Sequence, residues 1–436
     1  MNAANTSKRV LRNFGVVLRG RGIAALLTLG ATVLMAKALP ANQFGLVILL
    51  HTYVLAVRGI LNFRTFEAIV RFGVPLHESG DNAGLVRLLS RTTLIDAAAA
   101  LCATLIGVTA TGIAGKLLHW DADMTALAGV YSLVLLTFVI NTPNGVLRLY
   151  DRFDALGVFY TVGPSVRLIG VVTAWLAGSG METFIVVWAV AFLLENAWLF
   201  VRGHLELRRQ LGMSLPGARR VFGRAAPEDA DIRREFRRFI TVVYWQTNLD
   251  LLPKHFSVLL AGSLLGPAGA GMFRLAREFS SVLSRPAMML REVMFPDLAR
   301  MLHSGETGFS ELGFRAVRVA GAAGLGLVLL SILIAEPVLA AIGSEYTLAT
   351  TLVSLLLLSA TFELAGAPLR AAAYAMGRVA PVLHIHLLGV VVYFAAFALL
   401  APQLGLEGIG IAACLGTLLT LLLMTRLIRR GVPGPD

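Results

Sequence analysis

The chain has few charged residues and few cysteines for its length. Of its 436 residues only 15% are charged, whereas soluble proteins carry roughly 25%. Because hydrophobic residues make up 57% and the mean hydropathy is +0.75, the composition excludes an ordinary water-soluble protein. The two cysteines, Cys102 and Cys414, lie far apart in apolar stretches. We interpret both as small buried hydrophobic side chains, which carry no information about the redox compartment.

The sequence also lacks the common signatures of enzymes. No Gly-x4-Gly-Lys-[Ser/Thr] phosphate loop and no His-Glu-x2-His zinc motif occurs. His384 and His386 are two positions apart and would lie on different sides of a helix, so they cannot chelate one metal ion. Glycines at 321, 324 and 326 follow no strand, which argues against a dinucleotide fold. We therefore expect no enzyme activity, no metal site and no cofactor.

What the sequence does contain is twelve apolar stretches, each long enough to cross a bilayer at about 20 residues per span. The expected spans are 16–38, 44–62, 92–112, 124–147, 157–178, 181–202, 239–262, 269–291, 314–336, 347–368, 380–401 and 405–428. An apolar run from Val16 to Leu39 after Lys8, Arg9 and Arg12 also resembles a cleavable signal peptide, but it is long enough to be an uncleaved first helix.

Positive charge is distributed unequally between the two sides of these spans. One set of gaps, together with both termini, holds 30 of the 38 Lys and Arg residues. The opposite side holds two, Lys37 at the end of the first span and Lys116 in a gap, and six lie deeper inside the spans; basic residues at the cytoplasmic ends of spans are counted with the adjoining gaps. Cytoplasmic loops carry such an excess, so we expect both termini in the cytoplasm. The net charge of +12 then reflects loops that face anionic lipid, and we expect membrane lipid but no nucleic acid as a partner.

The two halves of the chain resemble each other weakly. Val33-Leu34-x-Ala36-x2-Leu39 recurs as Val258-Leu259-x-Ala261-x2-Leu264, and each copy is followed by a glycine that enters the next span. The largest basic gap, 204–238, lies between the two halves of the chain, and we interpret it as a cytoplasmic linker. The sequence thus predicts an all-α polytopic membrane protein with two six-helix lobes, 1–203 and 239–436. We expect them to be related by a pseudo-two-fold axis around a central cavity.

Short motifs along nearly the whole chain resemble the Wzx-type polysaccharide flippases. The motifs are Ala36-Lys37-x-Leu39-x4-Phe44-Gly45, Asp250-Leu251-Leu252, Gly266, Gly271-x-Phe273-x3-Arg277, Phe295-Pro296-Asp297-Leu298, Gly343-x2-Tyr346 and Gly405-x2-Gly408. Similar motifs occur across the wider superfamily, which includes multidrug/toxin extruders and lipid II flippases. The resemblance implies a protein of the bacterial inner membrane that carries a lipid-linked oligosaccharide. It also implies that spans 1, 2, 7 and 8 flank the cavity.

Charged residues inside the spans are the candidates for function. The cations are Arg58, Arg167, Lys254, Arg274, Arg277 and Arg285, and the acids are Asp96, Glu195, Asp250, Glu278 and Glu363. Six cations facing lipid would cost on the order of 15–20 kcal/mol. They must therefore line water, pair with acids, or lie near span ends and extend to the interface. For Arg285 the last explanation serves equally well.

Helical spacing places several of these groups on common faces. Arg274, Arg277 and Glu278 share one face of the eighth span, and Asp250 and Lys254 share one face of the seventh. The residues that we expect to bind an anionic substrate are His51, Arg58, Asn62, Lys254, Arg274, Arg277 and Arg285. The acids that we expect to couple transport to H⁺ or Na⁺ are Asp250 and Glu278. Alternatively, Asp250–Lys254 and Arg274–Glu278 are internal ion pairs that only lower the cost of burial.

Two further interpretations concern charges outside these stripes. Arg167 and His386 occupy matching positions in the two halves and could form a relay, or each is satisfied by helix packing. Asp96 and Glu363 we expect to be structural.

We therefore expect a secondary transporter. It would flip an undecaprenyl-diphosphate-linked oligosaccharide from the cytoplasmic to the periplasmic leaflet for cell-surface polysaccharide assembly, by alternating access. A cation-coupled multidrug extruder is the alternative. A glycan polymerase or ligase is disfavoured because the chain has no large external loop, although a polymerase or glycosyltransferase could be a partner at the linker.

Overall fold

A computed structural model describes residues 3–212, 230–304 and 309–429, and within these ranges the chain is helical with no strand. The elements are α1 (Ala3–Ala38), α2 (Ala41–Ile60), α3 (Thr65–Glu78), α4 (Asn82–Thr109), α5 (Thr111–Leu118), α6 (Ala122–Ser132), η1 (Leu133–Thr137), α7 (Asn141–Leu149), α8 (Phe153–Leu176), α9 (Met181–Leu211), α11 (Ala230–Ser304), α12 (Phe309–Ile342), η2 (Ser344–Ala349), α13 (Thr350–Ala375), α14 (Val379–Leu404) and α15 (Leu406–Arg429). This confirms an all-α polytopic membrane protein.

The described residues contain eleven helical stretches long and apolar enough to cross a membrane. One of them, Pro253–Ser281, contains parts of the predicted seventh and eighth spans. Large apolar side chains lie on the outside of these stretches; Leu176 and Leu333, for example, are 76% and 75% exposed. Such surfaces suit contact with lipid. Cys102 is also exposed, on α4, so its interpretation as a buried residue is wrong.

The chain divides into two compact units. Unit 1 comprises Met1–Leu39 and Leu50–Phe256, and unit 2 comprises Pro40–Leu49 and Ser257–Asp436. Two helices therefore contribute to both units: α2 begins in unit 2 and ends in unit 1, and α11 does the reverse. The lobe boundaries expected from the sequence stay a prediction. Of the linker expected at 204–238, residues 213–229 lie outside the described ranges, and its described ends continue α9 and begin α11.

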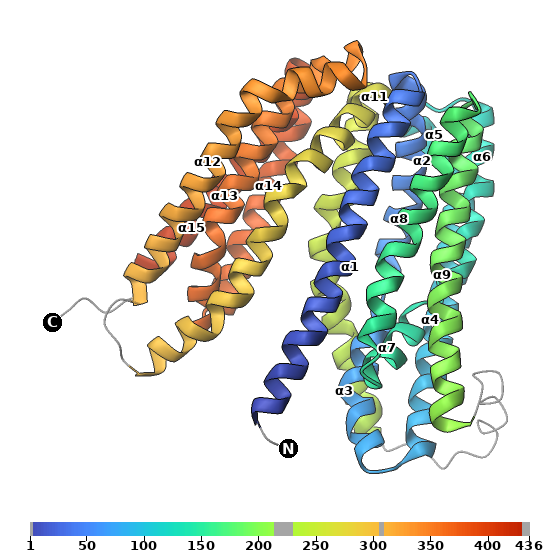
Figure 1. Ribbon diagram of the computed structural model, residues 1–436, viewed down its shortest axis with the longest axis vertical. Helices are drawn as coiled ribbons and strands as arrows, with labels where there is room; N and C mark the ends of the chain where they lie inside the picture. Colours follow the sequence, from blue (N-terminus) through green and yellow to red (C-terminus); the bar gives the residue numbers. More distant parts are fainter. Residues whose placement is uncertain (1–2, 213–229, 305–308, 430–436) are drawn as a thin grey trace. The chain divides into compact units, whose positions relative to one another are not determined.

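In unit 1, α1 and α8 lie side by side and α9 packs against α8 (Figure 1). The helices α1 and α8 approach closely because two glycines face each other. A Cβ added to Gly20 on α1 would lie 2.4 Å from the carbonyl oxygen of Gly157 on α8. Capping carboxylates fix other helix starts, since Asp81 accepts from the N–H of Gly84 at the start of α4. Close helix packing in this unit thus depends on small residues, as is common in membrane proteins.

The fourth predicted span, 124–147, lies within one candidate membrane span, Ala122–Leu149, but it is not one continuous helix. The helix α6 is followed by η1, and α7 begins only at Asn141. Pro143 explains the break, because it has no N–H to donate to the carbonyl of Val139 in a continuous helix. The break places the N-terminus of α7 inside the unit, where its N–H groups need acceptors.

In unit 2, α11 reverses direction at Gly266. This residue has φ 73° and ψ −178°, a conformation that favours glycine, and Pro267 follows in the position that suits a helix start. Arg277 donates to the hydroxyl of Ser257, 20 residues earlier, at 2.9 Å. In one straight helix these residues would be about 30 Å apart, so the two legs form a hairpin. The reversal lies in the gap predicted between residues 262 and 269.

The first turns of α2 pack against this hairpin within unit 2. The backbone N–H of Ala41 donates to the carboxylate of Glu345 at 2.8 Å, which caps the helix from η2. The ring of Phe44 meets that of Tyr346 edge to face at 6.0 Å. A Cβ on Gly45 would lie 1.8 Å from the carbonyl oxygen of Pro267. Several residues of the short motifs in the sequence therefore meet here as a packing cluster.

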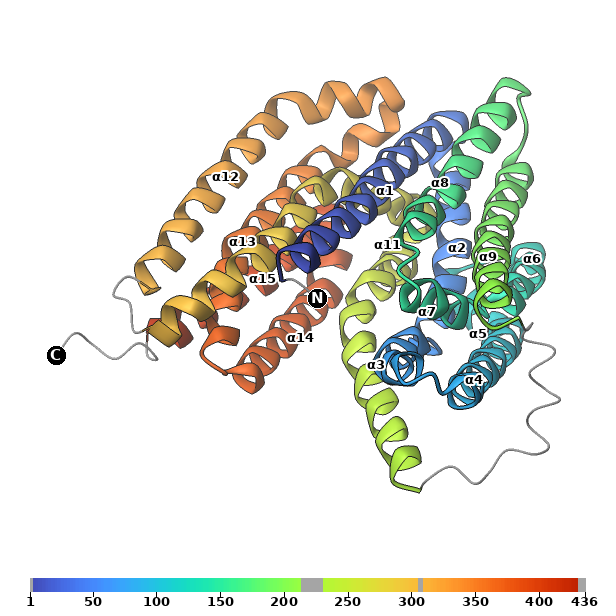
Figure 2. The same cartoon turned by 60° about the horizontal axis from the view of Figure 1, so that its bottom comes forward.

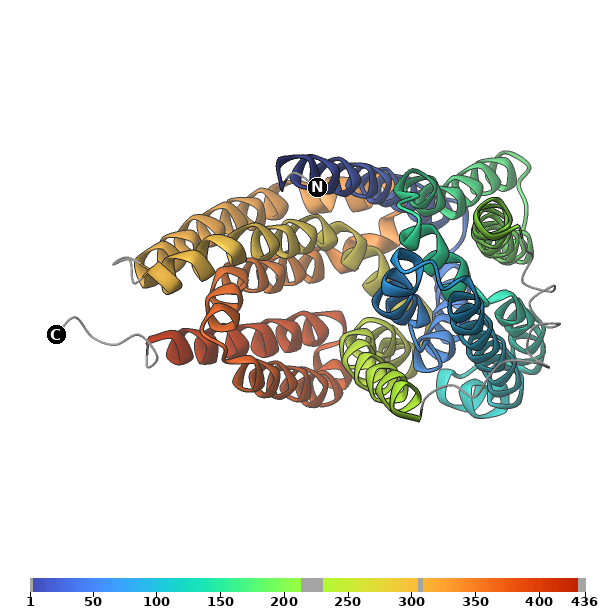
Figure 3. The ribbon, with the colours of Figure 1, turned by 90° about the horizontal axis from the view of Figure 1, so that it is seen from below.

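The remaining helices of unit 2 form a bundle. The helix α13 packs against α12 and α15, and α14 packs against α15 (Figure 2). Seen from below, these orange and red helices run alongside one another (Figure 3). The contacts again use small residues: a Cβ on Gly389 would lie 2.2 Å from the hydroxyl of Thr420, and Gly416 lies against Tyr393. The bundle thereby holds α14 firmly, and with it the aromatic residues that reach α11.

We predict that Gly45→Ala destabilises the protein by about 1–3 kcal/mol, since the new methyl group must push α2 away from Pro267. Thermal unfolding in detergent measures the effect. The matched control is Gly321→Ala in α12, where an added Cβ meets nothing within 4 Å. It should leave stability unchanged or raise it slightly. Equal melting temperatures for the two variants would contradict the packing described here.

Candidate functional site

Arg58 lies between two aromatic rings inside unit 1. Its guanidinium carbon is 4.1 Å from the ring centre of Phe138 and 4.9 Å from that of Phe192. Phe138 is the residue at which the fourth span breaks, directly after η1. The α2 helix therefore presents the cation to rings from the broken span and from α9. Each such contact is worth about 0.5–2 kcal/mol, which lowers the cost of holding a cation within the membrane.

Two more charges accompany Arg58. The guanidinium of Arg167 on α8 lies 3.6 Å from the carboxylate of Glu195 on α9. Glu195 attracts the Arg58 guanidinium and Arg167 repels it. Gly163 makes room for the pair, because a Cβ there would lie 2.0 Å from the Glu195 carboxylate. Arg58, Arg167 and Glu195, which we call the unit 1 cluster, thus bring two guanidinium groups and one carboxylate together.

His51, on the same helix as Arg58, is held by a hydrogen bond and by packing against aromatic rings. Its Nδ1 lies 2.8 Å from the hydroxyl of Tyr131. The imidazole also meets the ring of Trp188 edge to face at 6.4 Å. His51 was expected to contact substrate from the same face of α2 as Arg58. The structure places it among aromatic side chains of α6 and α9, and its role toward a substrate stays a prediction.

Asn62, another expected substrate contact, has local partners. Its side-chain oxygen accepts from the backbone N–H of Arg64 and from the amide of Asn141, both at 3.1 Å. It therefore helps to end α2 and to position the start of α7. A role for Asn62 in substrate binding stays a prediction.

Asp96 connects three helices at the same place. The carboxylate accepts from the hydroxyl of Thr65 at 2.7 Å and from both the N–H and the hydroxyl of Thr142 at 2.8 Å. The side chain is 2% exposed. Its charge thus satisfies the N-terminus of α7 inside the unit, where the helix dipole favours an anion. These contacts agree with the structural role expected for Asp96. Glu363 likewise lies 3.8 Å from Arg370.

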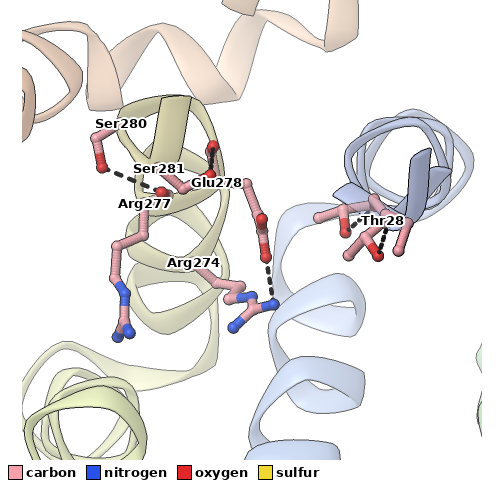
Figure 4. Close-up of polar contacts among 8 residues, drawn as sticks. Thr28, Arg274, Arg277, Glu278, Ser280 and Ser281 are labelled. Atoms are coloured by element: carbon pink, nitrogen blue, oxygen red, sulfur yellow. Dashed lines mark hydrogen bonds and ion pairs between the residues drawn. The ribbon is translucent and has the colours of Figure 1, made fainter. Parts of the chain in front are cut away.

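In unit 2, Arg274 and Glu278 form an ion pair on α11, as Figure 4 shows. The i,i+4 pairing expected as an alternative to substrate binding is therefore present in this structure. The hydroxyl of Ser281 donates to the backbone carbonyl of Glu278 at 2.7 Å. This hydrogen bond does not involve the carboxylate of Glu278, which pairs with Arg274. The pair holds Arg274 and leaves its side chain 25% exposed.

The side chain of Arg277 extends away from the Arg274–Glu278 pair in Figure 4. Besides the Ser257 hydroxyl, it lies 5.7 Å from the ring centre of its neighbour Phe273. Tyr393 on α14 interacts with both Arg277 and the Ser257 hydroxyl. Arg274 repels Arg277 and Glu278 attracts it. Arg274, Arg277 and Glu278, which we call the unit 2 cluster, again combine two guanidinium groups with one carboxylate.

The other expected site residues are less well defined. Lys254 is exposed on α11. The side chains of Asp250 and Arg285 lie outside the described residues, so the Asp250–Lys254 pair stays a prediction. The sequence identified Arg167 and Glu195 as candidates but did not predict that they pair, because they lie on different helices. Tyr393 was missed, because a single polar residue in an apolar span creates no periodic pattern.

The described ranges contain no group of three or more His, Cys, Asp or Glu side chains that could hold a metal ion. What both clusters can do instead is attract an anion. A guanidinium group makes two parallel hydrogen bonds to a carboxylate or a phosphate.

Comparisons with known proteins agree on the fold. No family model matches the chain. It is 25% identical over 344 residues to the inner membrane protein YghQ of Escherichia coli K12, covering 78% of this chain and 94% of YghQ. An inward-facing MATE family multidrug resistance transporter of the MOP superfamily matches with a TM-score of 0.74 at 15% identity, over 93% of this chain and 94% of that one.

Two further structures are similar. The lipid II flippase MurJ in an inward closed conformation has a TM-score of 0.68 at 10% identity and covers 94% of this chain and 86% of its own. A mutant of the MATE transporter VcmN of Vibrio cholerae has a TM-score of 0.61 at 17% identity, with 98% of both chains covered. The chain therefore has the fold of MOP-superfamily transporters. Membership of the Wzx-type family stays a prediction.

We predict that Glu195→Leu destabilises the protein by about 3 kcal/mol, because it leaves two guanidinium groups of the unit 1 cluster without their carboxylate. The double variant Arg167→Leu/Glu195→Leu should be more stable than Glu195→Leu alone, since it removes the repulsion as well. Unfolding of the single and double variants in detergent gives the coupling energy. Strictly additive effects would show that Arg167 and Glu195 do not interact.

Proposed function

We propose that this protein is a secondary transporter that flips an undecaprenyl-diphosphate-linked oligosaccharide from the cytoplasmic to the periplasmic leaflet. The observation that carries the proposal is the unit 1 cluster: two guanidinium groups against one carboxylate, within the spans, in a region lined by aromatic rings. The unit 2 cluster repeats this ratio. The similarity of the fold to a lipid II flippase supports the choice of a lipid-linked substrate.

The chemistry of a diphosphate suits such clusters. Its oxygens accept charge-assisted hydrogen bonds, and the planar fork of arginine donates two at once. The polyprenyl chain would remain in lipid. Alternating access would expose the headgroup site first to the cytoplasm and then to the periplasm.

Glu278 competes with the substrate for Arg274. Its carboxylate holds Arg274 in an ion pair. A phosphate that binds Arg274 would displace this carboxylate, and the ion pair would form again when the substrate leaves. Coupling of this exchange to H⁺ or Na⁺ through Glu278 stays a prediction.

A cation-coupled multidrug extruder is the second candidate, because the MATE transporters have the same fold. Organic cations require an excess of carboxylates at the binding site. Both clusters have the opposite ratio, which favours an anionic substrate.

We predict that Arg58→Ala and Arg277→Ala each reduce lipid-linked oligosaccharide flipping in proteoliposomes about tenfold or more, the loss expected when charge-assisted hydrogen bonds are removed. Surface glycan should fall in cells that carry only the variant. The matched control is Arg318→Ala at an exposed position near the start of α12, which should flip normally.

Two outcomes would contradict the proposal. Normal flipping by both variants, with membrane insertion and melting temperature unchanged, would remove the headgroup role. If cells that lack the protein instead accumulate cationic drugs and keep normal surface glycan, the extruder is the better description.

A further inference from the structure

A groove lies in unit 1 where α4 ends, α5 follows and α6 begins. Its volume is about 670 Å³, and its lining includes Thr111, Gly112, Lys116, Trp120 and Gly129. Volumes of this size are typical of sites for small ligands. The groove is separate from the unit 1 cluster, since Arg58, Arg167 and Glu195 do not line it.

Trp120 is part of the lining of the groove and has a hydrogen-bond donor without an acceptor. The side chain is 8% exposed, and its indole nitrogen is buried with no acceptor among the described residues. The ring itself is held edge to face against Tyr53 at 6.0 Å. A buried donor without an acceptor costs about 1–3 kcal/mol. An oxygen atom of a ligand in the groove would remove this cost.

Lys116 gives the groove its positive charge. It is exposed on α5, and it is one of only two basic residues on that side of the expected spans. The lining also contains one acid, Asp121, whose carboxylate accepts from the backbone N–H of Met124 at 2.7 Å and caps α6. The dipole at the start of α6 partly offsets its negative charge. The groove thus offers an anionic group one cation and one neutral donor, beside a carboxylate whose charge is partly compensated.

The surroundings of the groove are apolar and exposed. Ile113 and Leu117 on α5 are 66% and 59% exposed, and Val130 on α6 is 64% exposed. Val130 belongs to a candidate membrane span, and Ile113 and Leu117 belong to the short helix that precedes it. Small residues leave the floor open, because a Cβ on Gly112 or Gly129 would meet nothing within 4 Å. The ligand that fits is therefore amphiphilic, with one anionic end.

We propose that this groove binds an anionic glycerophospholipid from the leaflet on the side of Lys116. The phosphate lies at the Lys116 ammonium, a phosphate or ester oxygen accepts from the indole N–H of Trp120, and an acyl chain runs along the floor at Gly112 and Gly129. Tryptophan and lysine at the membrane interface commonly make such contacts with headgroups. The site is distinct from the proposed transport site.

Lipid binding by the full-length protein tests this directly. Purified protein is titrated with phosphatidylglycerol or phosphatidylcholine, and the retained lipid is counted by native mass spectrometry. We expect phosphatidylglycerol to be retained in preference. Lys116→Ala or Trp120→Phe should each weaken its retention about tenfold, as the loss of one such hydrogen bond predicts. Trp120→Phe keeps a ring against Tyr53 and removes only the donor.

Filling the groove provides the steric test. Gly129→Leu places a side chain in the open floor and should abolish the preference for phosphatidylglycerol without lowering the melting temperature. The matched control, Gly326→Leu, has equally open space on α12 and should bind lipid as the unchanged protein does. Free inorganic phosphate should not displace the lipid, because it lacks an acyl chain.

The proposal is overturned if both lipids are retained equally, or if Gly129→Leu and Gly326→Leu behave alike. It is also overturned if inorganic phosphate competes as effectively as the lipid. The readout is binding, so its result does not depend on whether the protein flips an oligosaccharide.

Discussion

The high cost of an ionised side chain in hydrocarbon is the constraint on which the rest of this structure depends. Each central arginine that faced lipid would cost roughly 2.5–3.5 kcal/mol on insertion scales. The protein avoids this cost by placing its intramembrane cations beside specific partners. Arg58 lies against two aromatic rings, Arg167 against Glu195, and Arg274 against Glu278. These partners reduce the cost, and they also leave two cations for each acid.

Two breaks in regular helix put these partners where they are needed. Pro143 interrupts the fourth span, which brings Phe138 to Arg58 and exposes the start of α7 to Asp96. Gly266 and Pro267 reverse α11, which brings Ser257 to Arg277. Backbone that is not helical is tolerated at this depth only where protein or water satisfies it. In both places the hydrogen-bond partners are side chains of the same unit.

Most of the fold could be predicted from the sequence, because long apolar runs and the unequal distribution of arginine report directly on helices that cross a membrane. Periodicity also placed Arg274 and Glu278 on one face correctly, since their contact lies within one helix. The Arg58–Arg167–Glu195 cluster could not be predicted in the same way, because its members come from three helices whose rotation and depth depend on packing. Asn62, which helical spacing would place on the face of Arg58, instead lies past the end of α2 and is engaged with Arg64 and Asn141.

The proposed function requires that water, and then the substrate, can reach the two clusters, and cysteine labelling measures this access most directly. Cysteine is placed at Arg58, Arg277 or, as a reference, Leu329, which is 65% exposed near the middle of α12, after Cys102 and Cys414 are replaced by alanine. Only a thiolate in contact with water reacts quickly with a charged thiol reagent. The account predicts rapid labelling at positions 58 and 277 and almost none at 329. Labelling at 58 and 277 that is as slow as at 329 would contradict it.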